Sequence, residues 1–278
     1  MPREVRIVFA DMDGTFLATN KDVPLRNLEA LDLLAERGIP FVPCTGRPVS
    51  AVPHELLAHP ATRYAVGSNG SVVFDVARQQ NLRVAGMDKR RVVALYERVR
   101  DVEATFDIFA DGSVYSERHR YEAMEAYGID RPTLEVLWRV REPVDASVPQ
   151  IVARSKEVDK VTCFWHRLQD KDALAAAIRQ VGGFSCAHGH PKNFELQAEG
   201  ISKGSALVWL CEYAGLDVRD AVAFGDEAND LPMIAAAGDG VAMANATPEV
   251  LGVADHVTGT NDEAGVAQYL FERLSQRP

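Results

Sequence analysis

The residues best placed to do chemistry are two aspartates, Asp11 and Asp13, which end a short apolar run and precede Gly14 and Thr15. The run, residues 5–10, is rich in β-branched side chains and predicts a buried parallel strand that ends at Asp11. Two carboxylates at the end of a buried strand are costly unless a cation neutralises them. A divalent cation that takes oxygen ligands, Mg²⁺ in particular, fits this demand. The pair therefore predicts a metal-dependent site.

A third carboxylate is expected at the same place. Asp226 follows Gly225 and a second apolar run, residues 220–224, so it is predicted to end another strand. Two more strand-like runs, 39–44 and 64–67, also end in polar residues. Because the carboxyl ends of parallel strands meet at one edge of a sheet, where ligands bind, these groups are expected to converge. The two clusters are Thr45-Gly46-Arg47 and Ser68-Asn69-Gly70.

The elements that must position these groups alternate between strand and helix. Residues 25–37 and 203–214 carry apolar side chains at helical spacing, between or after the strand-like runs. Strands that alternate with helices are typical of a doubly wound, Rossmann-like parallel sheet. The sequence therefore predicts the α/β class.

This alternation stops after about residue 84. Helices are predicted over 89–102 and 170–181, with Asp111-Gly112 as a hairpin turn, and the parallel pattern returns with the helix at 203. These features predict an α+β domain inserted into the α/β core. We expect the core to comprise residues 1–85 and 190–278 and the inserted domain residues 86–189. The strands predicted in the α+β pattern are 105–110, 114–116, 161–165, 184–188 and 194–196, and the strand at 220–224 belongs to the returning parallel pattern.

Four separate motifs resemble those of the haloacid dehalogenase superfamily, and they stand in the same order. The inserted domain and the segment 201–207 are similar to the Cof-type sugar-phosphate phosphatases, which carry a type IIB cap that closes over the site. The resemblance spans nearly the whole chain. The four motifs are Asp11-Met12-Asp13-Gly14-Thr15, Thr45-Gly46-Arg47, Lys203, and Gly225-Asp226-x-x-Asn229-Asp230.

The resemblance implies a role for each motif. Asp11 resembles the nucleophile that attacks phosphorus, and Asp13 the acid/base that protonates the leaving oxygen and then activates water, which suits carboxylates two residues apart on an extended backbone. Asp11, Asp226 and the carbonyl of Asp13 resemble ligands of Mg²⁺, with Asp230 behind them as a carboxylate that orients Lys203 or the metal waters. The groups that resemble a phosphate cradle are the amides of Met12 and Gly46, the hydroxyl of Thr45, the ammonium of Lys203 and, beside them, Asn229.

Arg47, Asn69 and two histidines have less definite roles. Arg47 either reaches a substrate anion or pairs with a surface carboxylate. Asn69 is expected to contribute to the site as well as to its turn. His188 and His190 invite a metal interpretation, but no third ligand at zinc-type spacing accompanies them, so a loop or hinge is favoured.

Composition restricts the partners. Thirty basic residues stand against forty acidic ones, a net charge of −10 that argues against nucleic acid, since phosphate backbones require clustered Lys and Arg. The first apolar run breaks at Asp11, so it does not form a signal peptide, and no unbroken apolar stretch reaches the length of a membrane span. We therefore expect a cytoplasmic protein whose four cysteines form no disulfide, acting as a monomer or homodimer on a small phosphorylated substrate.

The expected activity is magnesium-dependent hydrolysis of small phosphorylated metabolites through an aspartyl-phosphate. A phosphomutase of the phosphomannomutase type is the enzymatic alternative, and it would need extra cations in the cap. Six arginines are available there, although no spacing marks them as a site: Arg118, Arg120, Arg131, Arg139, Arg141 and Arg154. A non-catalytic phospholigand-binding protein is the alternative from another class, disfavoured because both Asp11 and Asp13 are present.

Overall fold

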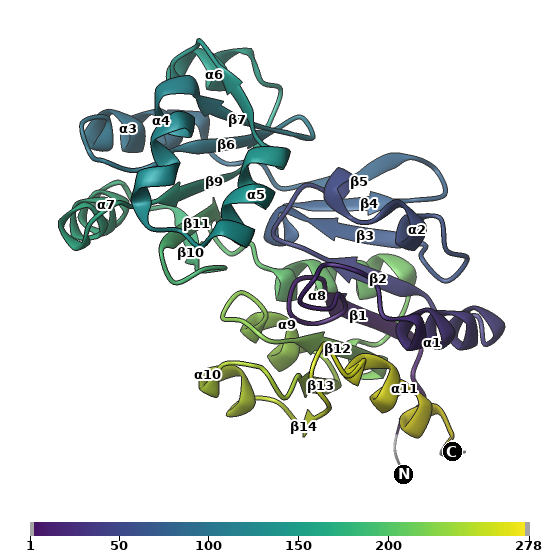
Figure 1. The fold of residues 1–278 in the computed structure, drawn as a ribbon. Coiled ribbons are helices and arrows are strands. Elements are labelled where there is room, and N and C mark those ends of the chain that lie inside the picture. Colours follow the sequence, from purple (N-terminus) through teal and green to yellow (C-terminus); the bar gives the residue numbers. More distant parts are fainter. Residues whose placement is uncertain (1–2, 276–278) are drawn as a thin grey trace. The chain divides into compact units, whose positions relative to one another are not determined.

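The computed structural model describes residues 3–275, which form two compact units (Figure 1). The first unit combines Met1–Arg83 with Ile201–Pro278, and the second is Val84–Gly200. An insertion into the chain was expected, but the second boundary predicted from the sequence, at residue 190, is wrong. The strand β11 (Asn193–Ala198) pairs antiparallel with β9 (Val158–Phe164), so it completes the sheet of the inserted unit.

The first unit is built on an eight-stranded sheet in the order β14-β13-β12-β1-β2-β3-β4-β5. Its strands are β1 (Ile7–Asp11), β2 (Phe41–Cys44), β3 (Tyr64–Gly67), β4 (Val72–Asp75), β5 (Gln80–Val84), β12 (Ala221–Gly225), β13 (Asp239–Ala242) and β14 (His256–Val257). The strand β1 is central and parallel to both β2 and β12, as the α/β prediction requires. The strand β4 runs antiparallel to β3, a departure from the parallel pattern at one side of the sheet.

Helices cover both faces of this sheet. On one face α1 (Leu25–Glu36) and α11 (Gly265–Ser275) pack on Val8 and Phe224, and on the other α8 (Lys203–Ala214) and α9 (Leu231–Ala236) pack on Phe9. Each of these side chains is fully buried, and burial of an aromatic side chain stabilises the fold by roughly 1.5–3 kcal/mol. The short helices of the unit are α2 (His54–Leu57), α10 (Pro248–Leu251) and the 3₁₀ turns η1 (Val49–Ala51), η2 (Ser68–Gly70) and η4 (Val218–Asp220).

The second unit is an α+β module on a six-stranded sheet of order β10-β11-β9-β6-β7-β8. Its remaining strands are β6 (Asp107–Ala110), β7 (Ser113–Glu117), β8 (Glu142–Val144) and β10 (Phe184–Ala187). Its helices are α3 (Lys89–Val99), α4 (Arg118–Ala123), η3 (Met124–Tyr127), α5 (Arg131–Val140), α6 (Val148–Arg154) and α7 (Leu168–Val181). Apolar side chains of α3, α6 and α7 share one core with the sheet, while those of η3 and α5 form a separate cluster with Phe164.

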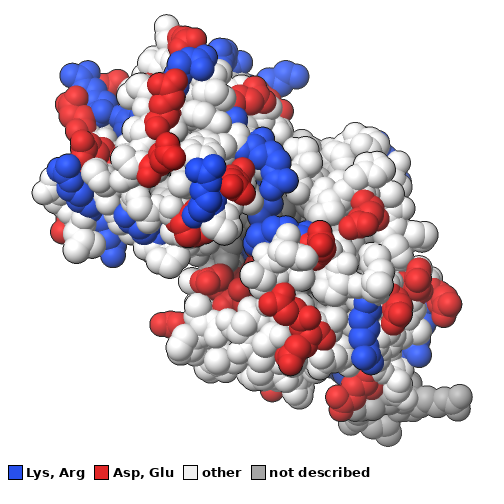
Figure 2. All heavy atoms as spheres, viewed as in Figure 1, with Lys and Arg blue, Asp and Glu red and all other residues white. Residues whose placement is uncertain are grey.

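Several local predictions can be compared with the structure. The hairpin turn at Asp111-Gly112 is confirmed, because both residues have positive φ (53° and 86°), as a two-residue turn of this kind requires. The helix predicted to 102 ends at Val99, and the strand predicted from 161 starts at Val158. All four cysteines are free thiols. No helix within residues 3–275 is long and apolar enough to cross a membrane. Figure 2 shows acidic and basic side chains mixed on the visible face of each unit.

Candidate active site

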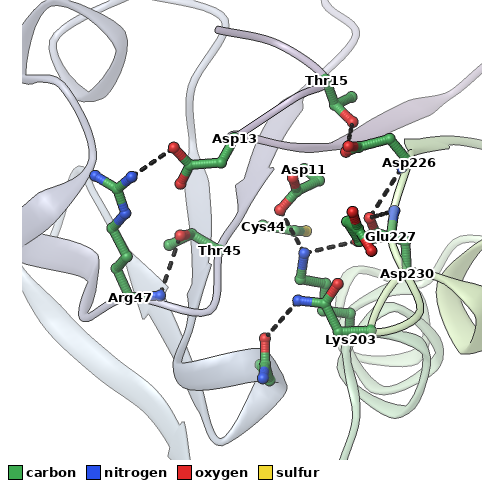
Figure 3. Close-up of polar contacts among 12 residues, drawn as sticks. Asp11, Asp13, Thr15, Cys44, Thr45, Arg47, Lys203, Asp226, Glu227 and Asp230 are labelled. Carbon is green, nitrogen blue, oxygen red and sulfur yellow. Dashed lines mark hydrogen bonds and ion pairs between the residues drawn. The ribbon is translucent and has the colours of Figure 1, made fainter. Parts of the chain in front are cut away.

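The site is set by parallel strand register in the first unit. Asp11 ends the central strand β1, which lies between β2 and β12, and its register partner on β2 is Cys44. Thr45 follows Cys44 directly, and Asp226 follows the last residue of β12. The carboxyl ends of three neighbouring strands therefore deliver Asp11, Thr45 and Asp226 to one edge of the sheet, as predicted (Figure 3).

Lys203 is the central cation of this edge. It is the first residue of α8, whose N-cap Ser202 accepts a hydrogen bond from the amide of Ser205, and its side chain is fully buried. The ammonium donates to Oδ1 of Asp11 and, at 2.6 Å, to Oδ1 of Asp230 (Figure 3). Burial alone would lower the pKa of Lys203, but the two carboxylates raise it, so the lysine stays charged.

Asp230 has both carboxylate oxygens engaged. While Oδ1 accepts from Lys203, Oδ2 accepts from the backbone amides of Asp226 (3.0 Å) and Glu227 (3.1 Å). Gly225 makes room for this arrangement, since a Cβ there would lie 2.4 Å from the Cβ of Asp230. Asp230 thus holds both Lys203 and the turn that carries Asp226.

Three buried carboxylates remain close together around this single lysine. Asp11, Asp226 and Asp230 each offer an oxygen within 4.8 Å of the others. Burial raises the pKa of Asp11 well above its usual value, although Lys203 opposes this, and burial with Asp230 raises the pKa of Asp226 to about 7. Negative charge here exceeds what Lys203 neutralises. The donor set, a cluster of buried carboxylate oxygens with a single lysine beside it, fits a hard divalent cation such as Mg²⁺.

Gly14 allows Asp226 to lie against the loop that follows Asp11. Its φ is +82°, and a Cβ at this position would lie 2.2 Å from Oδ2 of Asp226. Next to it, Oγ1 of Thr15 donates a 2.7 Å hydrogen bond to Oδ1 of Asp226. Asn245 adds a hydrogen bond to the carbonyl of Gly14 at 2.8 Å. The Asp-Gly-Thr segment therefore positions the third carboxylate as well as presenting the first two.

The side chain of Asp13 lies apart from this carboxylate group and beside Arg47 (Figure 3), and Lys21 is its second cationic neighbour. Arg47 donates to Oδ1 of Asp13, and the Lys21 ammonium lies 2.9 Å from the same oxygen. Burial would raise the pKa of Asp13, but Arg47 and Lys21 outweigh it and lower that pKa. Of the two interpretations of Arg47, the structure shows the carboxylate pair. The partner is Asp13, a residue of the candidate site, and not a surface carboxylate elsewhere.

Apart from Lys203, the predicted phosphate-binding groups lie on four loops, which follow β1, β2, β3 and β12. The Thr45 hydroxyl accepts from the amide of Arg47 at 3.1 Å, with Gly46 between them, and Met12 is buried between the two aspartates. Asn69, held at φ 54°, accepts a 3.2 Å hydrogen bond from Nδ2 of Asn229. The side-chain donors among these groups are thereby gathered on the strand-end loops, where an anion would meet them.

Sequence reasoning missed three neighbours of the site. Thr15 stood inside the first motif without an assigned partner, whereas Lys21 and Asn245 carried no local signal at all. Conversely, the structure does not bring His188 and His190 together on a ligand: His188 contacts the carbonyl of Asn193 and His190 contacts Asp130, at 2.6 and 3.2 Å. Cys44 is a fully buried core residue, and burial raises the pKa of its thiol, which makes it a poor nucleophile.

Comparisons with known proteins agree on one family. A sequence model described as haloacid dehalogenase-like hydrolase matches residues 8–270. The chain is 26% identical to the putative phosphatase YxeH of Bacillus subtilis, over 96% of this chain and 97% of that protein. It is also 26% identical to the pyridoxal phosphate phosphatase YbhA of Escherichia coli, over 97% and 98%.

The fold matches solved structures as well. A sugar phosphatase of haloacid dehalogenase subclass IIB superposes with a TM-score of 0.82 at 19% identity, covering 97% of this chain and 99% of that one. At this identity the match speaks for the fold alone, and it covers both the α/β core and the inserted unit.

Proposed function

The chain belongs to the haloacid dehalogenase-like hydrolase family and is a phosphoric monoester hydrolase, and from that premise we propose a magnesium-dependent mechanism through an aspartyl-phosphate on Asp11. The observation that carries the proposal is the Lys203 ammonium, fully buried between Asp11 and Asp230 at the strand ends. A lysine in this place fixes the nucleophile and supplies positive charge where the phosphoryl group would lie.

In the first step an oxygen of Asp11 forms a bond to phosphorus, and the bond from phosphorus to the leaving oxygen breaks. The Asp13 carboxyl gives its proton to that oxygen. In the second step water attacks the phosphorus of the aspartyl-phosphate, loses a proton to the Asp13 carboxylate, and releases inorganic phosphate. Asp13 thus donates a proton in the first step and accepts one in the second.

Asp13 must carry a proton when the leaving group departs, whereas Arg47 and Lys21 hold it ionised in the structure. An anionic substrate competes with Asp13 for these two cations. Once they bind the substrate, their hold on Asp13 weakens and its pKa rises. The Arg47–Asp13 ion pair is therefore proposed to couple substrate binding to protonation of the acid.

Magnesium is proposed to be held by Asp11, Asp226 and the backbone carbonyl of Asp13, with Asp230 behind them. When bound, the ion neutralises the buried carboxylates and the charge on the phosphoryl oxygens. Thr45, Gly46, Met12, Lys203 and Asn229 are proposed to bind the phosphoryl oxygens, together with Asn69 beside Asn229.

We propose small phosphorylated metabolites, sugar phosphates among them, as substrates. One relative is named a pyridoxal phosphate phosphatase, and the solved structure that shares the fold is named a sugar phosphatase; substrates of both kinds carry a phosphomonoester on a small polar body. Substrate selection is assigned to the inserted unit, Val84–Gly200. We also propose that the protein is cytoplasmic and acts as a monomer or a homodimer.

The test is hydrolysis of p-nitrophenyl phosphate by wild type and by Asp11→Asn, with circular dichroism to show that both are folded. Wild type should require Mg²⁺ and lose activity in EDTA, and Asp11→Asn should be inactive in both conditions. A folded variant with the wild-type rate would remove Asp11 from the chemistry. Turnover that EDTA leaves unchanged would remove the metal from the proposal.

A second assay, incubation with a hexose 1-phosphate, distinguishes hydrolysis from the mutase alternative. Free phosphate supports hydrolysis, and the 6-phosphate isomer supports the mutase. Two of the arginines that a mutase would need in the cap are already engaged: Arg120 pairs with Glu117 (2.8 Å) and Arg141 with Asp107 (2.9 Å), all four residues being buried. Absence of any turnover would instead favour the phospholigand-binding alternative.

A further inference from the structure

A pocket lies in the first unit at the amino ends of the parallel strands, whereas the catalytic residues lie at their carboxyl ends. It is lined by the segments that precede or open β1, β2 and β3, namely Arg6, Pro40 and Tyr64, and by Tyr213 near the end of α8. Its volume is about 550 Å³, within the range of small-molecule sites. Lys203 and Asp11 stand at the far ends of α8 and β1, so the two sites are about 16–18 Å apart along these elements.

The pocket is basic although the protein is acidic. Four arginines line it, Arg6, Arg37, Arg63 and Arg78, and Glu4 is the one acidic residue of its lining. Arg78 lies 3.6 Å from Asp75. Within residues 3–275 no carboxylate lies within ion-pair distance of the other three, and Arg37 donates instead to the carbonyl of Leu274. Most of this positive charge is therefore available to a ligand.

A neighbouring hollow shows the contrast. It has a volume of about 300 Å³ and also contains three arginines, Arg3, Arg219 and Arg273. Each of these pairs with an aspartate: Arg219 with Asp217, Arg273 with Asp239 at 3.2 Å, and Arg3 with Asp220 at 3.4 Å. All three arginines of this hollow thus pair with a carboxylate, whereas, among the residues that the structure describes, only Arg78 of the four arginines in the larger pocket does.

Aromatic rings line one wall of the larger pocket. The Tyr64 and Tyr213 rings meet edge to face, with centroids 6.4 Å apart, and Arg63 lies over Tyr64 at 5.2 Å. Tyr213 is 46% exposed and is backed by Trp209, whose ring stacks on it at 5.2 Å. An exposed ring held rigid by a second ring offers a stacking surface for a planar ligand.

We propose that this pocket binds a small organic phosphate that carries an aromatic ring, of the size and chemistry of a nucleotide. Guanidinium groups bind phosphate oxygens through paired, charge-assisted hydrogen bonds, which suits Arg6, Arg37 and Arg63. The ring would stack on Tyr213. The pocket is separate from the hydrolytic site, so binding there is a property beyond the proposed catalytic function.

The experiment is isothermal titration calorimetry with ADP in EDTA, on the full chain carrying Asp11→Asn so that no turnover consumes the probe. Arg6→Ala and Arg63→Ala are then added together. Both side chains are exposed, so the folded state tolerates the change. The matched control replaces Arg90 and Arg179, two exposed arginines of the inserted unit, by alanine and changes the net charge equally.

ADP should bind the parent protein, and removal of two guanidinium groups should weaken its affinity at least tenfold, while the control stays within about twofold of the parent. Tyr213→Ala should weaken ADP but leave pyrophosphate binding unchanged. Failure of ADP to bind, or equal affinities in the pocket and control variants, would overturn the proposal. Pyrophosphate binding as tight as ADP would overturn the assignment to ring-bearing phosphates. Equal melting temperatures of the unliganded variants would exclude misfolding as the cause.

Discussion

Replacement of Lys203 by methionine tests how charge is balanced in the site. The variant keeps the length of the side chain and removes the ammonium from between Asp11 and Asp230. Lys203 is 0% exposed, so water does not replace it, and removal of one partner from a buried ion pair costs about 3–5 kcal/mol. We expect the free energy of unfolding to fall by about that amount at pH 8 in EDTA.

The loss should depend on pH in a definite direction. Folding already raises the pKa of Asp11 and of Asp226, the latter to about 7. An aspartate whose pKa is raised in the folded state destabilises the fold progressively as pH rises from its unfolded pKa towards its folded pKa, and removal of Lys203 raises the pKa of Asp11 further. The destabilisation should therefore be smaller at pH 5, where these carboxyl groups bind protons, than at pH 8.

The assay is urea unfolding of wild type and Lys203→Met at pH 5 and pH 8, with Lys21→Met as the matched control. Lys21 also pairs with an aspartate, Asp13, but its side chain is 40% exposed, so its loss should cost under about 1 kcal/mol at either pH. Equal small losses in the two variants, or a loss at Lys203 that is independent of pH, would refute the reasoning.

Two further substitutions probe the first motif and the inserted unit. Gly14→Ala puts a Cβ at φ +82° against Asp226, so Mg²⁺-dependent turnover should fall at least about tenfold while the Mg²⁺ concentration for half activity rises, and a metal titration of activity measures both. Asp159 is buried, and burial, Asp111 and Glu157 raise its pKa to about 7, which destabilises the fold as pH rises from about 4 through 7. Asp159→Asn should raise the unfolding free energy at pH 8 by about 2–4 kcal/mol and leave it near wild type at pH 4, and urea unfolding that shows no gain at pH 8 would contradict this.

Much of the site was readable from the sequence because each group sits at a strand or helix end. Asp11 and Asp226 end apolar runs, and Lys203 opens a helix, so sheet topology alone brings them together across 192 residues in the case of Asp11 and Lys203. The environment of Asp13 was not readable. It depends on how Lys21 and Arg47 lie on two loops, and neither position is fixed by periodicity.

The fold shows the same division. Alternating strands and helices predicted the α/β core, and the turn at Asp111-Gly112 predicted a hairpin in the insert. The end of the insert was misplaced because the sequence predicted a strand at 194–196 but did not fix the sheet to which this strand belongs. The pairing of β11 with β9 and β10 assigns this strand to the inserted unit, and long-range pairing of this kind leaves no local signature in the sequence.

The most direct test of the account is capture of the phosphoryl group on Asp11. Wild type and Asp13→Asn are mixed with p-nitrophenyl phosphate and Mg²⁺, quenched in acid, and examined by peptide mass spectrometry. The peptide that contains Asp11 should gain the mass of one phosphoryl group, with greater yield in Asp13→Asn if loss of the base slows hydrolysis of the intermediate more than its formation. Asp11→Asn should gain none. Turnover by wild type with no phosphorylated Asp11 in any quenched sample, or a phosphoryl group found on another residue, would contradict the account.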